Sequence, residues 1–140
     1  MSQLSMTQQE REEFLAALHV GVLAVDRPGG SPLVVPIWYR YTAGGVVEFN
    51  TGGASEKVRL LEQVGRASVC AQREDLPYAY VTVEGPVEIN KTDRATRIDI
   101  ATRYLGTDAG TAYVEANPDD DEIVVRLRPT RWRTMDFSKL

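Results

Sequence analysis

The chain has 140 residues, of which 43% are hydrophobic and 26% are charged, and its formal net charge is −4. This size and composition predict one compact globular domain over residues 1–140. The negative charge argues against a nucleic-acid partner, because such a partner usually requires an excess of Lys and Arg on one face. The longest apolar stretch, residues 20–25, is far shorter than the roughly 18 to 20 residues that cross a bilayer, which argues against a membrane segment.

The first half of the chain predicts a helix, three strands and a second helix. Residues 7–18 have helical apolar spacing and begin with a capping box formed by Thr7 and Glu10. Glycine-containing turns separate three predicted strands, at residues 19–26, 32–41 and 46–50. A glycine-rich break then leads into a helix at residues 56–64.

The second half predicts two strands, two helices and two closing strands. Residues 67–72 and 78–90 form a strand pair, and Gly85-Pro86 marks an expected bulge or bend in the second of them. The remaining segments are helices at residues 92–105 and 108–116, followed by strands at residues 122–128 and 131–137.

This order of elements favours a mainly β, α+β fold. Short hairpins with helices only at the connections are typical of an antiparallel barrel, here with six to seven strands and peripheral helices. A doubly wound parallel sheet would need a helical crossover after nearly every strand, which this sequence does not offer.

The clearest candidate for a binding site is the turn at residues 51–57. A glycine-rich turn that opens a helix presents free backbone N–H groups and the positive end of the helix dipole, both of which suit a phosphate. Thr51 and Ser55 add hydroxyl donors, Lys57 adds a positive charge, and Arg59 adds a second one nearby. The residues alone also allow a plain structural interpretation, in which Ser55 is an N-cap and Lys57 a solvated surface residue.

The other chemically capable residues give weaker signals. Four aromatic residues either line a binding site for a flat ring or pack in the core or an interface: Trp38, Tyr39, Tyr78 and Tyr80. The four arginines of the last two strands form a polar face, from which one or two can reach an anionic cofactor tail.

No metal site or catalytic triad is expected. His19 is the only histidine and lacks a nearby nucleophile, so we expect a role at the end of the first helix. Cys70, the only cysteine, is expected to pack in a strand, and with His19 it cannot supply zinc-ligand spacing. The acidic run at residues 119–122 lacks the spacing of a calcium loop and predicts a solvated loop. The first residues lack the order of a signal peptide, so we expect a cytoplasmic protein.

Taken together, the sequence resembles the pyridoxamine 5′-phosphate oxidase-like split-barrel superfamily, and within it the flavin/deazaflavin oxidoreductases that use FMN or coenzyme F420. The resemblance covers nearly the whole chain and is carried by the order of six fragments: residues 21–25 (GVLAV), 31–39 (SPLVVPIWY), 57–61 (KVRLL), 65–69 (GRASV), 83–87 (VEGPV) and 131–133 (RWR).

The resemblance implies roles for particular residues. It assigns the cofactor phosphate to Thr51, Ser55 and Lys57, and it places Val35, Pro36 and Ile37 along the cofactor ring and chain. It leaves Tyr80 either as a proton donor or as a pocket-lining residue. It further implies a homodimer with the cofactor groove between subunits.

Two departures from the family pattern bear on the choice of cofactor. Glu56 and Val35 stand where the FMN-using oxidases carry arginines, and this loss of two cations favours F420 over FMN. The leading hypothesis is therefore an F420-dependent oxidoreductase that transfers a hydride between the deazaflavin and a small conjugated substrate. The alternatives are an FMN-dependent oxidase or reductase on the same barrel, and a non-catalytic flavin- or deazaflavin-binding carrier or sensor.

Overall fold

The computed structural model describes residues 3–118 and 121–140. These residues form eight strands and four α-helices, and a short 3₁₀ helix, Phe137–Lys139, ends the chain. The strands are β1 (Gly21–Val25), β2 (Leu33–Ile37), β3 (Arg40–Tyr41), β4 (Val47–Gly52), β5 (Arg66–Arg73), β6 (Ala79–Lys91), β7 (Glu122–Leu127) and β8 (Arg131–Asp136). The helices are α1 (Gln8–Ala16), α2 (Glu56–Val64), α3 (Arg94–Leu105) and α4 (Thr107–Ala116).

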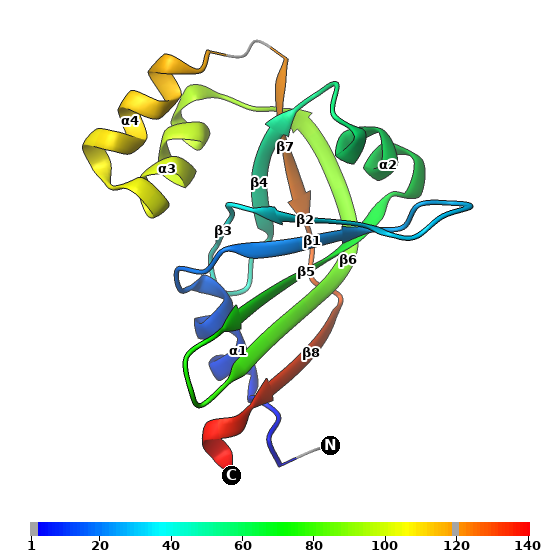
Figure 1. Ribbon diagram of the computed structural model, residues 1–140, viewed down its shortest axis with the longest axis vertical. Helices are drawn as coiled ribbons and strands as arrows, with labels where there is room; N and C mark the ends of the chain where they lie inside the picture. Colours follow the sequence, from blue (N-terminus) through cyan, green and yellow to red (C-terminus); the bar gives the residue numbers. More distant parts are fainter. Residues whose placement is uncertain (1–2, 119–120) are drawn as a thin grey trace.

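The strands form one curled antiparallel sheet (Figure 1). Its order is β2-β1-β5-β6-β7-β4-β3, and β8 pairs with β6 outside this path. Strands β2 and β3 thus lie at opposite ends of the sheet, although only Trp38 and Tyr39 separate them in sequence. The sheet must curl until its two ends meet at this joint, which gives the split barrel that the sequence predicts.

The same joint explains the one difference in strand number. The sequence predicts a single strand over residues 32–41, but β2 pairs with β1 and β3 pairs with β4, so the segment is divided between the two ends of the sheet. The sequence pattern does not reveal this division. Both halves of residues 32–41 show the two-residue alternation of a β-strand, whichever strand each half pairs with.

Strand β6 joins the two halves of the barrel. Its first part pairs with β5 and β8, and its last part, from Val87 onward, pairs with β7. The change of partner falls beside Gly85 and Pro86, where the sequence predicts a bend. The chain between β7 and β8 crosses here, with Arg128 N–H donating to Pro86 O at 3.0 Å and Thr130 N–H donating to Glu84 O at 2.9 Å.

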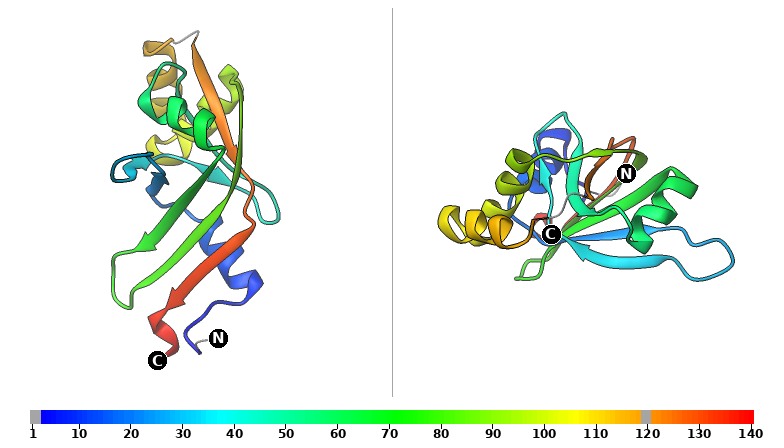
Figure 2. Two further views of the ribbon diagram at one scale, coloured as in Figure 1. Left: turned by 90° about the vertical axis from the view of Figure 1, so that its right-hand side faces the viewer. Right: turned by 90° about the horizontal axis from the view of Figure 1, so that it is seen from above.

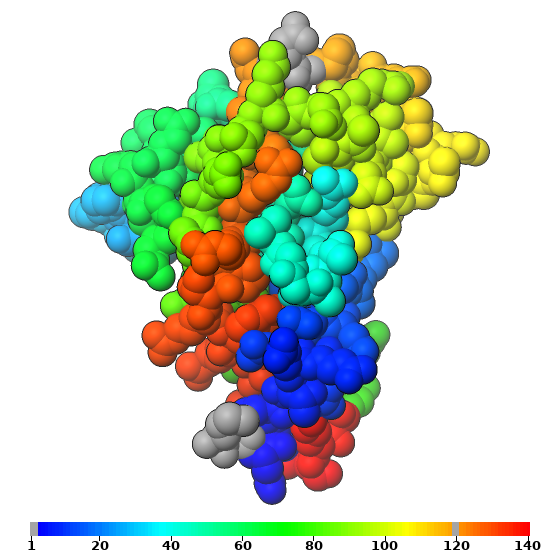
Figure 3. All heavy atoms as spheres, turned by 180° about the vertical axis from the view of Figure 1, so that it is seen from behind, coloured from blue at the N-terminus to red at the C-terminus, as the bar shows by residue number. Residues whose placement is uncertain are grey.

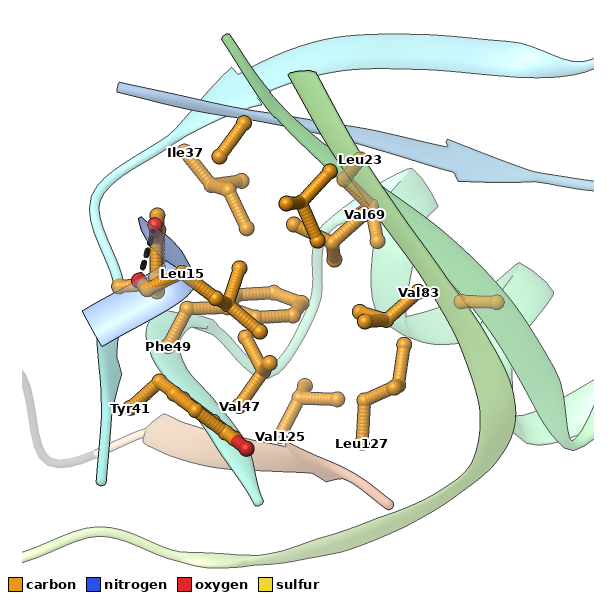
Figure 4. Packing of buried hydrophobic residues seen from close by; sticks show 14 of the residues in the cluster. Leu15, Leu23, Ile37, Tyr41, Val47, Phe49, Val69, Val83, Val125 and Leu127 are labelled. Carbon is orange, nitrogen blue, oxygen red and sulfur yellow. Dashed lines mark hydrogen bonds between the residues drawn. The ribbon is translucent and has the colours of Figure 1, made fainter. Parts of the chain in front are cut away.

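A continuous apolar core fills the barrel (Figure 4). Phe49 and Leu23 are completely buried, and Leu15 of α1 closes one side of the cluster. Inward positions alternate with outward ones along β1, β4 and β6, as a curled sheet with one buried face requires. Burial of this apolar surface is the main stabilising contribution to the fold.

The helices begin and end close to the predicted positions. Thr7 and Glu10 form the capping box of α1, and Ser55 caps α2 by accepting a hydrogen bond from Val58 N–H. Helices α2, α3 and α4 lie at one end of the molecule, whereas α1 lies at the other end beside the last residues of the chain (Figures 1 and 2). There Lys139 pairs with Glu10 at 2.8 Å.

Helices α3 and α4 pack mainly against each other and form a shoulder beside the sheet (Figure 3). Side-chain contacts connect α3 to the rest of the chain. Arg40 pairs with Asp99 at 2.7 Å, and Tyr104 hydrogen-bonds to the backbone of Tyr39. None of the helices in the described ranges has both the length and the apolar composition of a transmembrane span.

The crossing at Gly85 gives a stability prediction. A Cβ atom at Gly85 would lie 1.9 Å from Arg128 O, so Gly85→Ala forces backbone to move and is expected to lower the unfolding free energy by more than about 3 kcal/mol. The control is Gly30→Ala, where the nearest atom is a flexible part of Arg27 at 3.4 Å, and the expected change is within about 1 kcal/mol. Urea unfolding of both variants measures the difference, and equal losses would contradict this account of the crossing.

Candidate functional site

A pocket of about 600 Å³ lies between the sheet and the α3–α4 shoulder. One wall comes from the end of β2, the end of β4 and the first turn of α2, and the other comes from α3, α4 and the start of β7. Its size falls within the range of pockets that bury a small organic ligand.

One end of the pocket is polar and carries a positive charge. Thr51, Gly52 and Lys57 line it where β4 gives way to α2. The Lys57 side chain has no carboxylate within ion-pair distance among the residues of the described ranges. A lysine in the first turn of a helix, at the positive end of the helix dipole, is an arrangement that suits an anion.

Gly53 fixes the course of this turn. Its N–H donates to Asp121 O at 3.0 Å, and a Cβ atom at this position would lie 2.6 Å from the same oxygen. Only glycine allows the turn to approach the chain before β7 so closely. The register of β4 with β7 then places Glu122 opposite Gly52 at the edge of the pocket.

The structure brings together four of the eight residues that the sequence predicts for cofactor binding. Pro36, Ile37, Thr51 and Lys57 all line the pocket. Ser55 is the N-cap of α2, next to the polar end, and so has the structural role that the sequence also allowed. The assignment of these residues to a cofactor stays a prediction.

The other three predicted residues lie outside the pocket lining. Val35 is partly buried and packs against the barrel core, while Arg59 is exposed on α2. Tyr80 lies on β6, where it is paired with Gln72 and Met135 in the sheet. No contact of these residues indicates a role in binding.

An aromatic wall, formed by the residue that follows β2 and by a residue of α4, lines part of the pocket. Trp38 and Tyr113 both line it, with ring centroids 5.9 Å apart and planes tilted by 50°. Behind Trp38, the ring of Tyr104 stacks on the indole at 4.9 Å with planes only 7° apart. Trp38 thus packs against Tyr104 and lines the pocket, while its contact with a flat ligand ring stays a prediction, and Tyr39 is fully buried in the core.

The Tyr104 hydroxyl group holds this wall in place. It accepts from Tyr39 N–H at 3.0 Å and lies 2.7 Å from His19 O and 3.1 Å from Tyr39 O. Burial raises the pKa of Tyr104, so the hydroxyl keeps its proton at neutral pH. The indole therefore rests on a ring that is itself fixed by backbone contacts.

A largely buried ion pair joins α3 to the start of β7. Arg97 Nε lies 2.9 Å from Glu122 Oε2, and the two side chains are only 12% and 16% exposed. The Nε group is not aligned for a hydrogen bond to this oxygen, but Arg97 Nη2 donates to Asn117 O at 2.6 Å. Both charged residues line the pocket, so α3 and β7 contribute a paired cation and anion to it.

Sequence reasoning missed Arg97, Tyr113 and Glu122 as pocket residues. They belong to α3, α4 and the start of β7, and no local motif connects them with the turn at residues 51–57. Glu122 comes to lie beside Gly52 through the pairing of β4 with β7, which no local signal in the sequence predicts.

The lone histidine and cysteine have structural surroundings. His19 follows α1, where Nε2 lies 2.9 Å from Phe14 O and the ring stacks on Phe14 at 4.5 Å, which confirms a helix-end role. Burial is the main reason that the pKa of His19 is lowered. Cys70 lies in β5, as predicted. Residues 119 and 120 of the acidic run lie outside the described residues, which themselves contain no cluster of metal-ligating side chains.

The sequence matches the model of the pyridoxamine 5′-phosphate oxidase family over residues 7–136. The chain belongs to this family. No curated protein matches the sequence. The family model thus accounts for nearly all of the chain.

Solved structures support the same assignment. The conserved hypothetical protein Rv2991 from Mycobacterium tuberculosis is 25% identical, with a TM-score of 0.82 over 99% of this chain and 90% of that one. An F420 reductase is 26% identical, with a TM-score of 0.66 over 87% of this chain and 94% of that one. A putative pyridoxamine 5′-phosphate oxidase from Listeria innocua, 12% identical with a TM-score of 0.71 over 91% and 96%, shares the fold.

The buried ion pair of the pocket gives a stability prediction. Arg97→Met leaves the Glu122 carboxylate without its cation and is expected to lower the unfolding free energy by about 3 kcal/mol at pH 7. The control Arg94→Met, on the same helix, breaks the Arg94–Glu115 pair, whose side chains are 63% and 59% exposed. Its expected cost is below about 1 kcal/mol. Urea unfolding distinguishes the two, and an equally small loss for Arg97→Met would show that the pair is effectively solvated.

Proposed function

We propose that this protein is an F420-dependent oxidoreductase whose cofactor phosphate lies at the Lys57 end of the pocket. The observation that carries the proposal is the Lys57 ammonium group, which lines the pocket at the first turn of α2 without a carboxylate partner among the described residues. Membership of the family and the likeness to an F420 reductase support the class of cofactor.

The residues present fit a phosphate-bearing flavin or deazaflavin. Lys57 offers a positive charge and Thr51 a hydroxyl group at one end, while Pro36 and Ile37 offer an apolar edge for a flat ring. When bound, the cofactor supplies the hydride-transfer chemistry. The chain's own contribution is to orient the two reactants and to keep water from the space between the walls.

Two contacts favour F420 over FMN. The resemblance implies an arginine at position 56 in FMN-using relatives. Here Glu56 occupies that position and pairs with Arg27 of the β1–β2 hairpin at 2.7 Å. Val35, the second such position, packs against the core and offers no charge. Within the described part of the chain, the pocket thus offers a phosphate one cation that has no carboxylate partner, Lys57. A single cation suits a phosphodiester such as that of F420 better than the dianionic phosphate of FMN.

The proposal predicts that Lys57→Ala weakens cofactor binding. Loss of one charge-assisted hydrogen bond removes about 1.5 to 3 kcal/mol, so the Kd for F420 is expected to rise by about 10- to 100-fold. Fluorescence polarisation of F420 titrated with purified protein gives the Kd. The matched control is Lys91→Ala, an exposed lysine at the end of β6 outside the pocket lining, and its Kd is expected to stay unchanged.

The same titration with FMN separates the competing functions. Tighter binding of F420 than of FMN supports the proposal, and saturable binding of FMN alone assigns the pocket to a flavin enzyme instead. Tight F420 binding without oxidation of reduced F420 across a broad panel of acceptors indicates a carrier or sensor. If Lys57→Ala leaves the affinity for both cofactors unchanged in a folded protein, the phosphate site lies elsewhere.

We also propose that the chain works as a homodimer. Large apolar side chains remain exposed on the described residues, among them Val20 at 53%, Tyr78 at 53% and Leu140 at 88%. A second copy of the chain could cover such side chains, and the resemblance to the split-barrel family supports this arrangement. Light scattering after size exclusion is expected to give twice the mass of the chain, and the dimer should persist in 1 M NaCl, since salt does not screen apolar contacts. A monomer at micromolar concentration would contradict this proposal.

A further inference from the structure

The first turn of α2 carries charges of both signs. Glu56 begins the helix and Lys57 follows it, while Ser55 caps the helix by accepting a hydrogen bond from Val58 N–H. The N–H groups of the first residues of a helix have no acceptor within it, and Glu56 and Lys57 occupy these positions. An anion that reaches this turn therefore meets an ammonium group and backbone donors, but also the carboxylate of Glu56.

The Glu56 carboxylate is itself an anion that suits this turn. Acidic side chains near a helix N-terminus are attracted by the helix dipole and by the N–H groups that lack an acceptor. The Glu56 side chain is 49% exposed, so it has room to move. Without a partner, it would compete with the phosphate of a ligand for the same N–H groups and for Lys57.

Arg27 of the β1–β2 hairpin holds this carboxylate outside the pocket. Its Nη2 group donates to Glu56 Oε1 at 2.7 Å, and its Nη1 group donates to Ser31 O at 3.2 Å. The second contact lies within the hairpin, where Gly30 N–H also donates to Arg27 O at 3.0 Å, so the hairpin itself positions the guanidinium group. The hairpin lies beside α2 (Figures 1 and 2). As a result, Lys57 lines the pocket and Glu56 does not.

We infer that Arg27 is a positioning residue for the anion site. By binding the Glu56 carboxylate, it keeps Lys57 and the start of α2 available to a phosphate group. This inference rests on the proposed function, which supplies the phosphate-bearing ligand. It adds to that function a residue that lies outside the pocket lining, in a hairpin distant in sequence from α2.

A purely structural role for the ion pair makes a different prediction. In that case Arg27 only attaches the hairpin to α2, and loss of either partner weakens ligand binding equally. If Arg27 instead neutralises a competing anion, loss of Glu56 does no harm, because the competing carboxylate disappears together with its partner. Glu56→Gln therefore distinguishes the two roles.

Four proteins test the inference: the unmodified chain, Arg27→Ala, Glu56→Gln and the double variant. Fluorescence polarisation of F420 at low ionic strength gives the Kd of each. We expect Arg27→Ala to raise the Kd about two- to fivefold, and Glu56→Gln to leave the Kd unchanged or lower it. The double variant is expected to match Glu56→Gln within about twofold. The loss caused by Arg27→Ala is expected to shrink in 1 M NaCl, since salt screens exposed charges.

A matched control breaks another exposed ion pair. Arg94→Ala removes the partner of Glu115, which lies 2.8 Å away outside the lining of this pocket, and the Kd for F420 is expected to stay unchanged. Urea unfolding checks that every variant is folded, as expected for pairs that are this exposed. Weakening by Glu56→Gln equal to that by Arg27→Ala, or a double variant as weak as Arg27→Ala, overturns the inference.

A second probe separates failure of this inference from failure of the proposed function. Inorganic phosphate is titrated into ¹⁵N-labelled protein, and shifts of the Glu56 and Lys57 amide signals report an anion at this turn without a cofactor. Shifts that need more phosphate in Arg27→Ala, and return in the double variant, support the inference. If neither F420 nor FMN binds to such a protein, only the proposed function is overturned. Absence of phosphate-dependent shifts at these two amides overturns the inference, whether or not F420 binds.

Discussion

The two-residue joint between β2 and β3 shapes every other part of the fold, because it requires the sheet to curl until its ends meet. Two residues, Trp38 and Tyr39, connect strands that stand at opposite ends of the sheet order. Tyr39 is fully buried there, and its hydroxyl donates to Leu15 O at 2.7 Å. Burial raises the pKa of Tyr39, which keeps this donor protonated. The Tyr39 side chain thus attaches α1 to the joint that closes the barrel. Its hydroxyl group needs an acceptor there, because burying an unpaired hydroxyl group in this core would lower the stability of the fold.

The same joint builds the pocket. Its two residues project to opposite sides, Tyr39 into the core and Trp38 into the pocket, as neighbours in an extended chain do. Tyr104 of α3 bonds to the backbone of Tyr39 and stacks on the ring of Trp38. Since α3 and α4 pack mainly against each other, these contacts and the Arg97–Glu122 pair set the position of the shoulder and the width of the pocket.

The candidate site divides into a part that local sequence predicts and a part that it does not. Thr51, Ser55 and Lys57 belong to one turn, where glycine, an N-cap residue and a lysine follow one another, so spacing alone indicates their common role. Arg97, Tyr113 and Glu122 come from three later elements and meet the turn only through strand pairing and helix packing. Arg59 and Tyr80, whose chemistry suits a cofactor, do not line this pocket, and their roles stay a prediction.

Alternation, helical spacing and caps are local properties of the chain, so the sequence is enough to predict the elements, their order and the antiparallel class of the sheet. It also predicts a bend at Gly85 and Pro86, which is where β6 changes from pairing with β5 and β8 to pairing with β7. The anion site at the turn before α2 stays a prediction. The fold alone shows that residues 32–41 divide between the two ends of the sheet, and that aromatic rings and an ion pair line the same pocket as Lys57. These features depend on contacts between residues far apart in sequence, and no period or motif along the chain records which distant surfaces come to lie together.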